Sequence, residues 1–323
     1  MRKKTFSILA LTLCFALCAI PFVTAPAADG ARIENRYSYR GILTLYTLDT
    51  FEGGINSRAD FLNRAAVSFE KKNRGVFVQV VPVTEYELSD RLSRGLAPDL
   101  LLYSFGCYET LRAQFVPYTQ AVNFADSLRQ TEDAVPIWYG GYFSFVANPE
   151  YPFVCGHADH TNPCLAALLS DQTVVPEHGY TQKSAYEAFV FRKYNLIGTQ
   201  RDVFRTRNSD RPLEKAVFSD FTDLVQYGSV VGISEERAYF AQKFLEYLTS
   251  AEIQRKLTEI GMFSVSGEKL YEGILGEFEA RLPNLILPKL DRSAAEIDSE
   301  RERAIRAFSD ETEKKALLQA YGH

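Results

Sequence analysis

The residues best suited to chemistry gather in one short stretch, CGHADHTNPC, which runs from Cys155 to Cys164. Cys155, His157, His160 and Cys164 offer two sulfurs and two imidazole nitrogens, a donor set that suits tetrahedral zinc. Their spacing is not one of the usual zinc patterns. In an oxidising compartment, a loop of about ten residues that contains Gly and Pro can instead close a disulfide between the two cysteines. We favour the disulfide, and a zinc site or two unpaired thiols remain alternatives.

The sequence contains none of the common catalytic signatures. We find no G-x-S-x-G elbow, H-E-x-x-H helix, P-loop or dinucleotide-binding glycine fingerprint. A zinc hydrolase built from Cys155, His157, Asp159 and His160 is the one enzyme that the side chains suggest. Cys107 is expected to be a buried thiol, although its place in a loop leaves its role open. We therefore predict a protein that is not an enzyme and has no cofactor.

The N-terminus has the organisation of an export signal. A basic start, Met1 to Lys4, precedes an apolar run from Phe6 to Ile20 and a small-residue site at Ala25-Pro26-Ala27. This predicts a signal peptide over residues 1–27, with an uncleaved N-terminal anchor as the alternative. Leu13 and Leu17 precede the two cysteines of this segment where a lipoprotein signal needs small residues. A secreted, cell-surface or periplasmic location is expected.

Composition limits the remaining classes. The 323 residues have 46% hydrophobic and 24% charged content, which is typical of a globular protein large enough for two lobes. The formal net charge is −5, and removal of the basic signal makes the exported chain more acidic. Because nucleic acids attract basic surfaces, a nucleic-acid partner is not expected.

The first part of the mature chain alternates strand and helix patterns. Strands are expected over 40–48, 76–83 and 99–103, with helices over 58–72 and 85–94, and this order implies a mainly parallel sheet. Ligands of such sheets bind beyond the carboxyl ends of the strands. Two loops after strands are therefore candidate binding loops, and they contribute Asp49, Thr50, Glu52, Tyr103 and Ser104.

The stretch SEERAYFAQKFLEYLTSAEIQRKLTEIGMFSV, residues 234–265, predicts two helices, a stop at Gly261 and an extended end. Ser234 can cap the first helix, and Glu235 and Glu236 favour its positive first turn. The segment FLEYLTSAEIQRKLTEIGMFSV resembles the late helical segment of extracytoplasmic solute-binding proteins of ABC importers. Two further segments agree with this resemblance: the Pro-Asp strand APDLLLY, residues 97–103, and AVPIWYGGYFSFVANPEYP, residues 134–152.

The resemblance implies a type II, carbohydrate-type binding protein: two α/β lobes, each a mainly parallel sheet flanked by helices, with a cleft between them. Lobe 1 would comprise residues 28–143 and 228–266, and lobe 2 residues 144–227 and 267–323. Position within the family pattern suggests six further ligand-binding residues, Trp138, Tyr139, Tyr142, Tyr227, Ser229 and Phe263. For Trp138, a place in an aromatic core is an equal alternative.

The resemblance implies that the protein captures a small solute, which in this class is typically a carbohydrate, by closure of the two lobes. It would then deliver the solute to the permease subunits of an ABC importer. A monomer is expected. The rival interpretation is an exported ligand-sensing or partner-binding protein that uses the same fold.

Overall fold

The computed structural model describes residues 39–322 except 50, 52–53, 159, 171–175, 207–214 and 233. Tyr39–His323 forms a compact unit separate from Met1–Ser38. The predicted signal peptide, Thr50, Glu52 and Asp159 lie outside the described residues. Within the part of the chain that is described, no helix has both the length and the apolar content needed to span a bilayer.

The first sheet has the strand order β2-β1-β3-β11-β4, and β5 also pairs with β11. Its first three strands are parallel, whereas β11 runs antiparallel to its three neighbours. The strands are β1 (Gly41–Leu48), β2 (Val76–Val83), β3 (Leu100–Tyr103), β4 (Phe115–Val116), β5 (Val135–Tyr139) and β11 (Val225–Val231).

The second sheet has the order β10-β6-β9-β7-β8. Here β7 is parallel to β8 and β9, and β6 is antiparallel to β9 and β10. Both sheets are therefore mixed, because β11 in the first sheet and β6 in the second run against the other strands of their sheet. The strands are β6 (Tyr142–Val146), β7 (Phe153–His157), β8 (Glu177–Thr181), β9 (Asn195–Thr199) and β10 (Lys215–Phe218).

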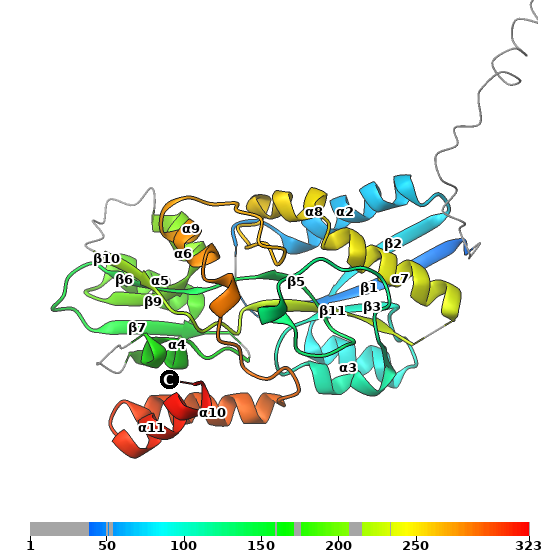
Figure 1. Cartoon of the computed structure of the whole chain (residues 1–323). Helices are drawn as coiled ribbons and strands as arrows, with labels where there is room; N and C mark the ends of the chain where they lie inside the picture. The colour runs from blue at the N-terminus through cyan, green and yellow to red at the C-terminus, as the bar shows by residue number, and fades with distance from the viewer. Residues whose placement is uncertain are drawn as a thin grey trace, which may run out of the picture. The chain divides into compact units, whose positions relative to one another are not determined.

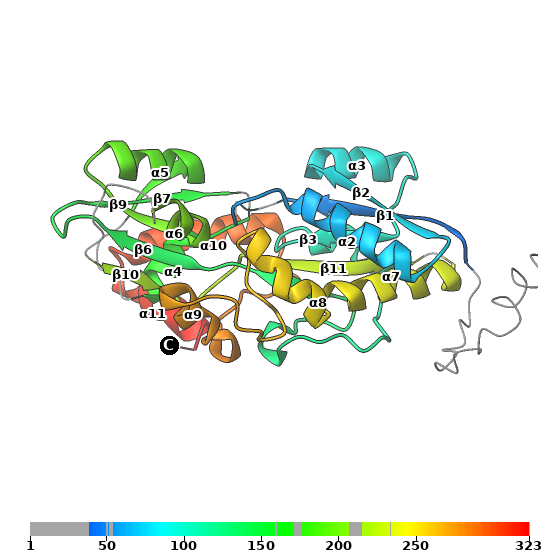
Figure 2. The same cartoon turned by 90° about the horizontal axis from the view of Figure 1, so that it is seen from above.

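Helices cover both faces of each sheet (Figures 1 and 2). On the first sheet, α2 (Arg58–Lys72) and α7 (Glu235–Leu248) lie on one face and α3 (Glu85–Ser93) on the other. On the second sheet, α4 (Pro163–Leu169) and α5 (Gln182–Phe191) lie on opposite faces. The other helices are α6 (Gln200–Thr206), α8 (Ala251–Gln254), α9 (Gly273–Glu279), α10 (Ala294–Ala307) and α11 (Glu311–Ala320). Short 3₁₀ turns are η1 (Tyr108–Thr110), η2 (Arg112–Gln114), η3 (Asp126–Leu128), η4 (Arg255–Glu259) and η5 (Leu282–Asn284).

Local sequence explains where the main helices begin and end. The Ser57 hydroxyl accepts a hydrogen bond from the Asp60 amide, and Ser234 caps α7 in the same way. The Ser234 cap agrees with the prediction from sequence. The second predicted helix divides into α8 and η4, and Gly261, at φ +65°, ends it in the left-handed conformation that glycine adopts without cost.

Three segments connect the two sheets. The first is the turn between β5 and β6, the second leads from Phe221 into β11, and the third contains Phe263, which pairs with Tyr139 before the chain continues to α9. Gly141, in the first connection, allows close packing, because a Cβ there would lie 2.3 Å from the Phe278 ring. The connections are therefore tightly packed rather than loose linkers.

Candidate functional site

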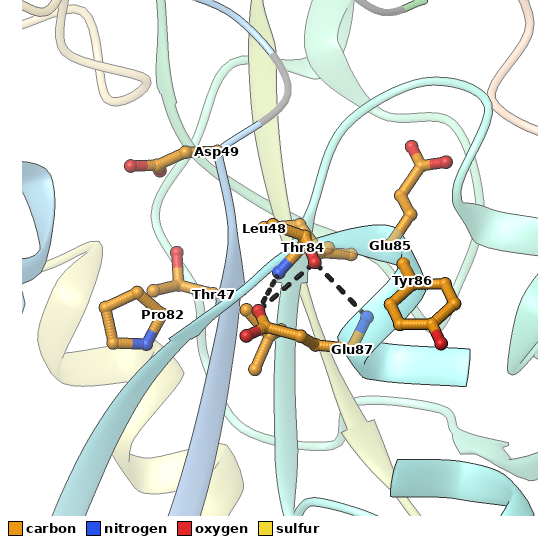
Figure 3. A pocket seen from close by; sticks show the side chains of 9 residues that line it. Thr47, Leu48, Asp49, Pro82, Thr84, Glu85, Tyr86 and Glu87 are labelled. Atoms are coloured by element: carbon orange, nitrogen blue, oxygen red, sulfur yellow. Dashed lines mark hydrogen bonds between the residues drawn. The ribbon is translucent and has the colours of Figure 1, made fainter. Parts of the chain in front are cut away.

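A cavity lies at the carboxyl ends of β1 and β2, where parallel α/β sheets bind ligands (Figure 3). Its volume is about 460 Å³, which is within the range of small-molecule sites. Nine residues line it: Thr47, Leu48, Asp49, Pro82, Val83, Thr84, Glu85, Tyr86 and Glu87. We call this feature the strand-end cavity.

Polar groups of β1 face this cavity. The Asp49 carboxylate is half-exposed, and the buried Arg58 holds it at an Nε–Oδ1 distance of 3.3 Å. The Thr47 hydroxyl is buried and has no hydrogen-bond partner among the described residues. The oriented carboxylate offers an acceptor to a polar solute, and the buried hydroxyl is a donor that a solute could use once it is exposed.

The start of α3 forms the other side of the cavity. The Thr84 hydroxyl and the Glu87 carboxylate form a capping box that fixes this helix end, as the dashed lines of Figure 3 show. The Glu85 and Tyr86 side chains point away from this capping box (Figure 3), and Tyr86 is 83% exposed. An exposed aromatic ring next to carboxylates is the arrangement that binds the apolar face and the hydroxyls of a sugar.

Glu85 also connects the two sheets. Its Oε1 lies 2.5 Å from His160 Nε2 and accepts a hydrogen bond from the Cys107 thiol at 3.2 Å. The hydrogen bond from His160 is the main cause that lowers the pKa of the Glu85 carboxyl. Cys107 follows β3 of the first sheet, whereas His160 follows β7 of the second. Loops at the carboxyl ends of both sheets therefore meet at this carboxylate.

A second polar contact between the connections centres on the buried Asp223. Its carboxylate accepts hydrogen bonds from the Tyr142 hydroxyl and the Asn162 amide, both at 2.6 Å. Its carbonyl lies 3.5 Å from the Ser104 hydroxyl. Burial raises the pKa of Asp223 to about 6, because desolvation disfavours the charged form. Two predicted site residues, Ser104 and Tyr142, thus contact the same buried acid.

Three other predicted residues lie together in the first sheet. The Tyr103 hydroxyl is 2.8 Å from the Ser229 hydroxyl, which donates to the Asp133 carbonyl at 2.6 Å. Tyr227 donates to the Leu128 carbonyl at 3.3 Å. All three predicted side chains are fully buried, so in this conformation their hydroxyl groups form hydrogen bonds within the protein. Their role toward a solute remains a prediction.

The predicted aromatic residues of the first connection are also buried. Trp138 is 0% exposed and meets Phe61 of α2 edge to face at 6.1 Å, which places it in the core. Tyr139 packs on Phe263 at 5.3 Å, and both rings contact Phe278 of α9. These rings fill the space between the connections, and solute contact through them remains a prediction.

The cysteine pair lies apart from His160. The Cys155 and Cys164 sulfurs are buried, 3.5 Å apart and unbonded. The adjacent Cys164 sulfur, together with burial, raises the pKa of the Cys155 thiol. His157 ends β7, and His160 lies against Glu85 and Cys107 instead. The disulfide therefore remains a prediction, and the four suggested zinc ligands do not form one cluster.

The sequence prediction included Asp49, which lines the strand-end cavity, but not Glu85 and Tyr86, which line it as well. The rule that selected the loops after β1 and β3 applies equally to the end of β2, where Val83 is followed directly by α3. Applying it to that third strand end would have identified both residues.

No protein-family model matches the sequence, and no curated protein matches it. Solved structures do match the fold. The ABC substrate-binding protein Lmo0181 from Listeria monocytogenes, solved with cycloalternan, has 11% identity and a TM-score of 0.56 over 88% of this chain and 100% of that chain. The GacH receptor of Streptomyces glaucescens, solved unliganded and with acarbose, has 13% identity and a TM-score of 0.57 over 88% and 97%. The Atu4243-GABA receptor has 15% identity and a TM-score of 0.56 over 84% and 98%.

The chain therefore has the two-lobed α/β fold of ABC substrate-binding proteins, and the fold predicted from sequence is confirmed. At these identities the similarity establishes the fold alone.

Proposed function

We propose that this chain is an extracytoplasmic solute-binding protein that captures a carbohydrate in the strand-end cavity and delivers it to an ABC importer. The observation that carries the proposal is the position of the cavity, at the carboxyl ends of β1 and β2 in a fold shared with such proteins. Asp49 and Glu85 would accept hydrogen bonds from sugar hydroxyls, Thr47 would donate one, and Tyr86 would stack on the ring.

The mechanism follows from the connections between the sheets. Lobe 1, which carries the first sheet, would rotate against lobe 2, which carries the second sheet, about the first two connections. The solute would favour the closed form because that form adds contacts from the second lobe. The membrane permease would recognise the closed monomer, and no chemical step on the solute is involved.

A thermal-melt screen of the exported form, residues 28–323, tests the proposal. The panel contains mono- and oligosaccharides, amino acids, polyamines and phosphate. A solute that binds only the folded state stabilises it by about 2.7 kcal/mol at a hundredfold excess over Kd. A shift with a saccharide supports the proposal, and a shift only with amines or amino acids overturns the carbohydrate assignment. No shift with any member favours the sensor or partner-binding alternative.

Two variants locate the solute within the cavity. Tyr86→Ala should weaken saccharide binding by about two- to tenfold, the equivalent of 0.5–1.5 kcal/mol of stacking. Phe191→Ala is the matched control, because that ring is also exposed, at 81%, but lies on α5 of the second sheet. Equal affinity of both variants and the wild type would place the solute elsewhere.

A further inference from the structure

We propose that Glu85, Cys107 and His160 form a binding site for a divalent transition-metal ion of the zinc class, which joins the loops of the two sheets. One carboxylate oxygen, one sulfur and one imidazole nitrogen lie within 4.8 Å of one another. Nitrogen, sulfur and oxygen are the three donor types of protein zinc sites. The proposal goes beyond solute capture and does not depend on it.

The distances suit a metal after a small movement. Zinc bonds of about 2.0–2.3 Å place tetrahedral ligand atoms roughly 3.3–3.8 Å apart. The Cys107 sulfur is already 3.2 Å from Glu85 Oε1, and His160 Nε2 is 2.5 Å from the same oxygen. The histidine and the carboxylate would separate by about 1 Å as the ion replaces the proton between them, and the Cys107 thiol would lose its proton as well, so that two protons pass to the solvent. A water molecule would complete the tetrahedron.

The backbone conformation at His160 and Gly106 places the imidazole ring next to Cys107 and Glu85. His160 has φ +59°, a left-handed conformation that only a few per cent of non-glycine residues adopt. Gly106, next to Cys107, faces the ring: a Cβ at Gly106 would lie 2.7 Å from His160 Cγ. The absence of a side chain at Gly106 therefore allows the imidazole to approach both the thiol and the carboxylate.

The site also combines burial with access. Cys107 is 3% exposed and the His160 side chain 10%, whereas the Glu85 side chain is 49% exposed. An ion can enter from the side of the carboxylate and then meet two ligands that are shielded from water. Because the ligands come from the ends of β2, β3 and β7, a bound ion would join the first sheet to the second.

Titration of the reduced exported form with Co²⁺ and Zn²⁺ tests this site. Co²⁺ bound to a thiolate gives a near-ultraviolet charge-transfer band, and Zn²⁺ should displace it and raise the melting temperature. Cys107→Ser should abolish the band, and Glu85→Gln and His160→Asn should each raise the Kd for Zn²⁺ at least about 100-fold. Asn is chosen at position 160 because it tolerates a positive φ.

Cys164→Ser is the matched control, since it removes a buried thiol from the cysteine pair and leaves the proposed site intact. A band that survives in Cys164→Ser and is lost in Cys107→Ser supports the proposal. The opposite pattern would assign the metal to the cysteine pair and overturn it. Absence of Co²⁺ and Zn²⁺ binding by the wild type would also overturn it. Glu85→Gln changes a half-exposed side chain, so it reports on binding even if a buried substitution impairs folding.

Discussion

Asp223 should give this protein a measurable decrease in stability as the pH rises. Its carboxyl is 2% exposed, and burial raises its pKa from an ordinary 3.8 to about 6. Between these values the folded state holds a proton that the unfolded state has lost. The stabilisation is therefore complete below about pH 4 and is lost as the pH rises through 6. The shift of about two units corresponds to about 3 kcal/mol.

Asp223→Asn removes this titration while keeping an acceptor for the Tyr142 hydroxyl. Urea unfolding, followed by the fluorescence of the buried Trp138, gives the free energy of unfolding of both proteins at each pH. The wild-type value minus the variant value should fall by about 3 kcal/mol between about pH 3.5 and pH 7.5. Asp126→Asn, which removes a carboxylate that is 93% exposed, is the control for the loss of one acidic group. A difference for Asp223→Asn that is constant or rises with pH would refute the reasoning.

Two further predictions concern the packing on which the fold depends. Gly141→Ala should destabilise the protein by about 1–3 kcal/mol, because the new methyl group would overlap the Phe278 ring. Urea unfolding measures this loss of stability. An unchanged free energy of unfolding would show that the connection can relax around the methyl group. Arg237→Ala should cost about 2–3 kcal/mol, because it leaves the buried Asp99 carboxylate without its cation at 2.7 Å. Arg64→Ala, which breaks an exposed pair, should cost under about 1 kcal/mol, and equal losses for the two arginine variants would contradict the argument.

Local patterns were sufficient for much of the fold. The helix at residues 58–72 and the strand at residues 76–83 have the predicted bounds, because a serine cap and a β-branched run mark their ends. The order of strands and helices indicated a mainly parallel α/β sheet, and the resemblance of three segments, 97–103, 134–152 and 244–265, suggested the binding-protein fold. Between residues 150 and 220 the patterns are weaker, and β7, β8 and β9 were not predicted there.

The site was harder to predict, since it depends on contacts between distant residues. Glu85 and His160 are 75 positions apart. No rule of sequence spacing predicts that the start of a helix on one sheet contacts a loop of the other sheet. Trp138 illustrates a different difficulty, which is that of deciding whether an aromatic ring lies in the core or in a binding site. It lies on β5, whose five residues are all buried, so an alternation of buried and exposed positions could not indicate which aromatic ring would face a solute.

The cysteines show a third limit of sequence reasoning. Spacing grouped His160 with Cys155 and Cys164, because the three residues are close in the chain. The fold turns the His160 side chain toward Cys107 and Glu85 instead. Residue types alone favoured a disulfide and left a zinc site or two thiols as alternatives, whereas the partners of His160 required the three-dimensional arrangement.

A solute that binds in the strand-end cavity should lose affinity when a polar group of the cavity is removed. The most direct measurement is titration calorimetry of the exported form with the saccharide that gives the largest thermal shift, for the wild type and for Asp49→Asn. Asp49→Asn removes a charged acceptor that Arg58 holds in place, and such hydrogen bonds are worth about 1.5–3 kcal/mol. We expect Kd to increase roughly 10- to 150-fold. An unchanged Kd, or no saccharide binding by the wild type, would contradict this expectation.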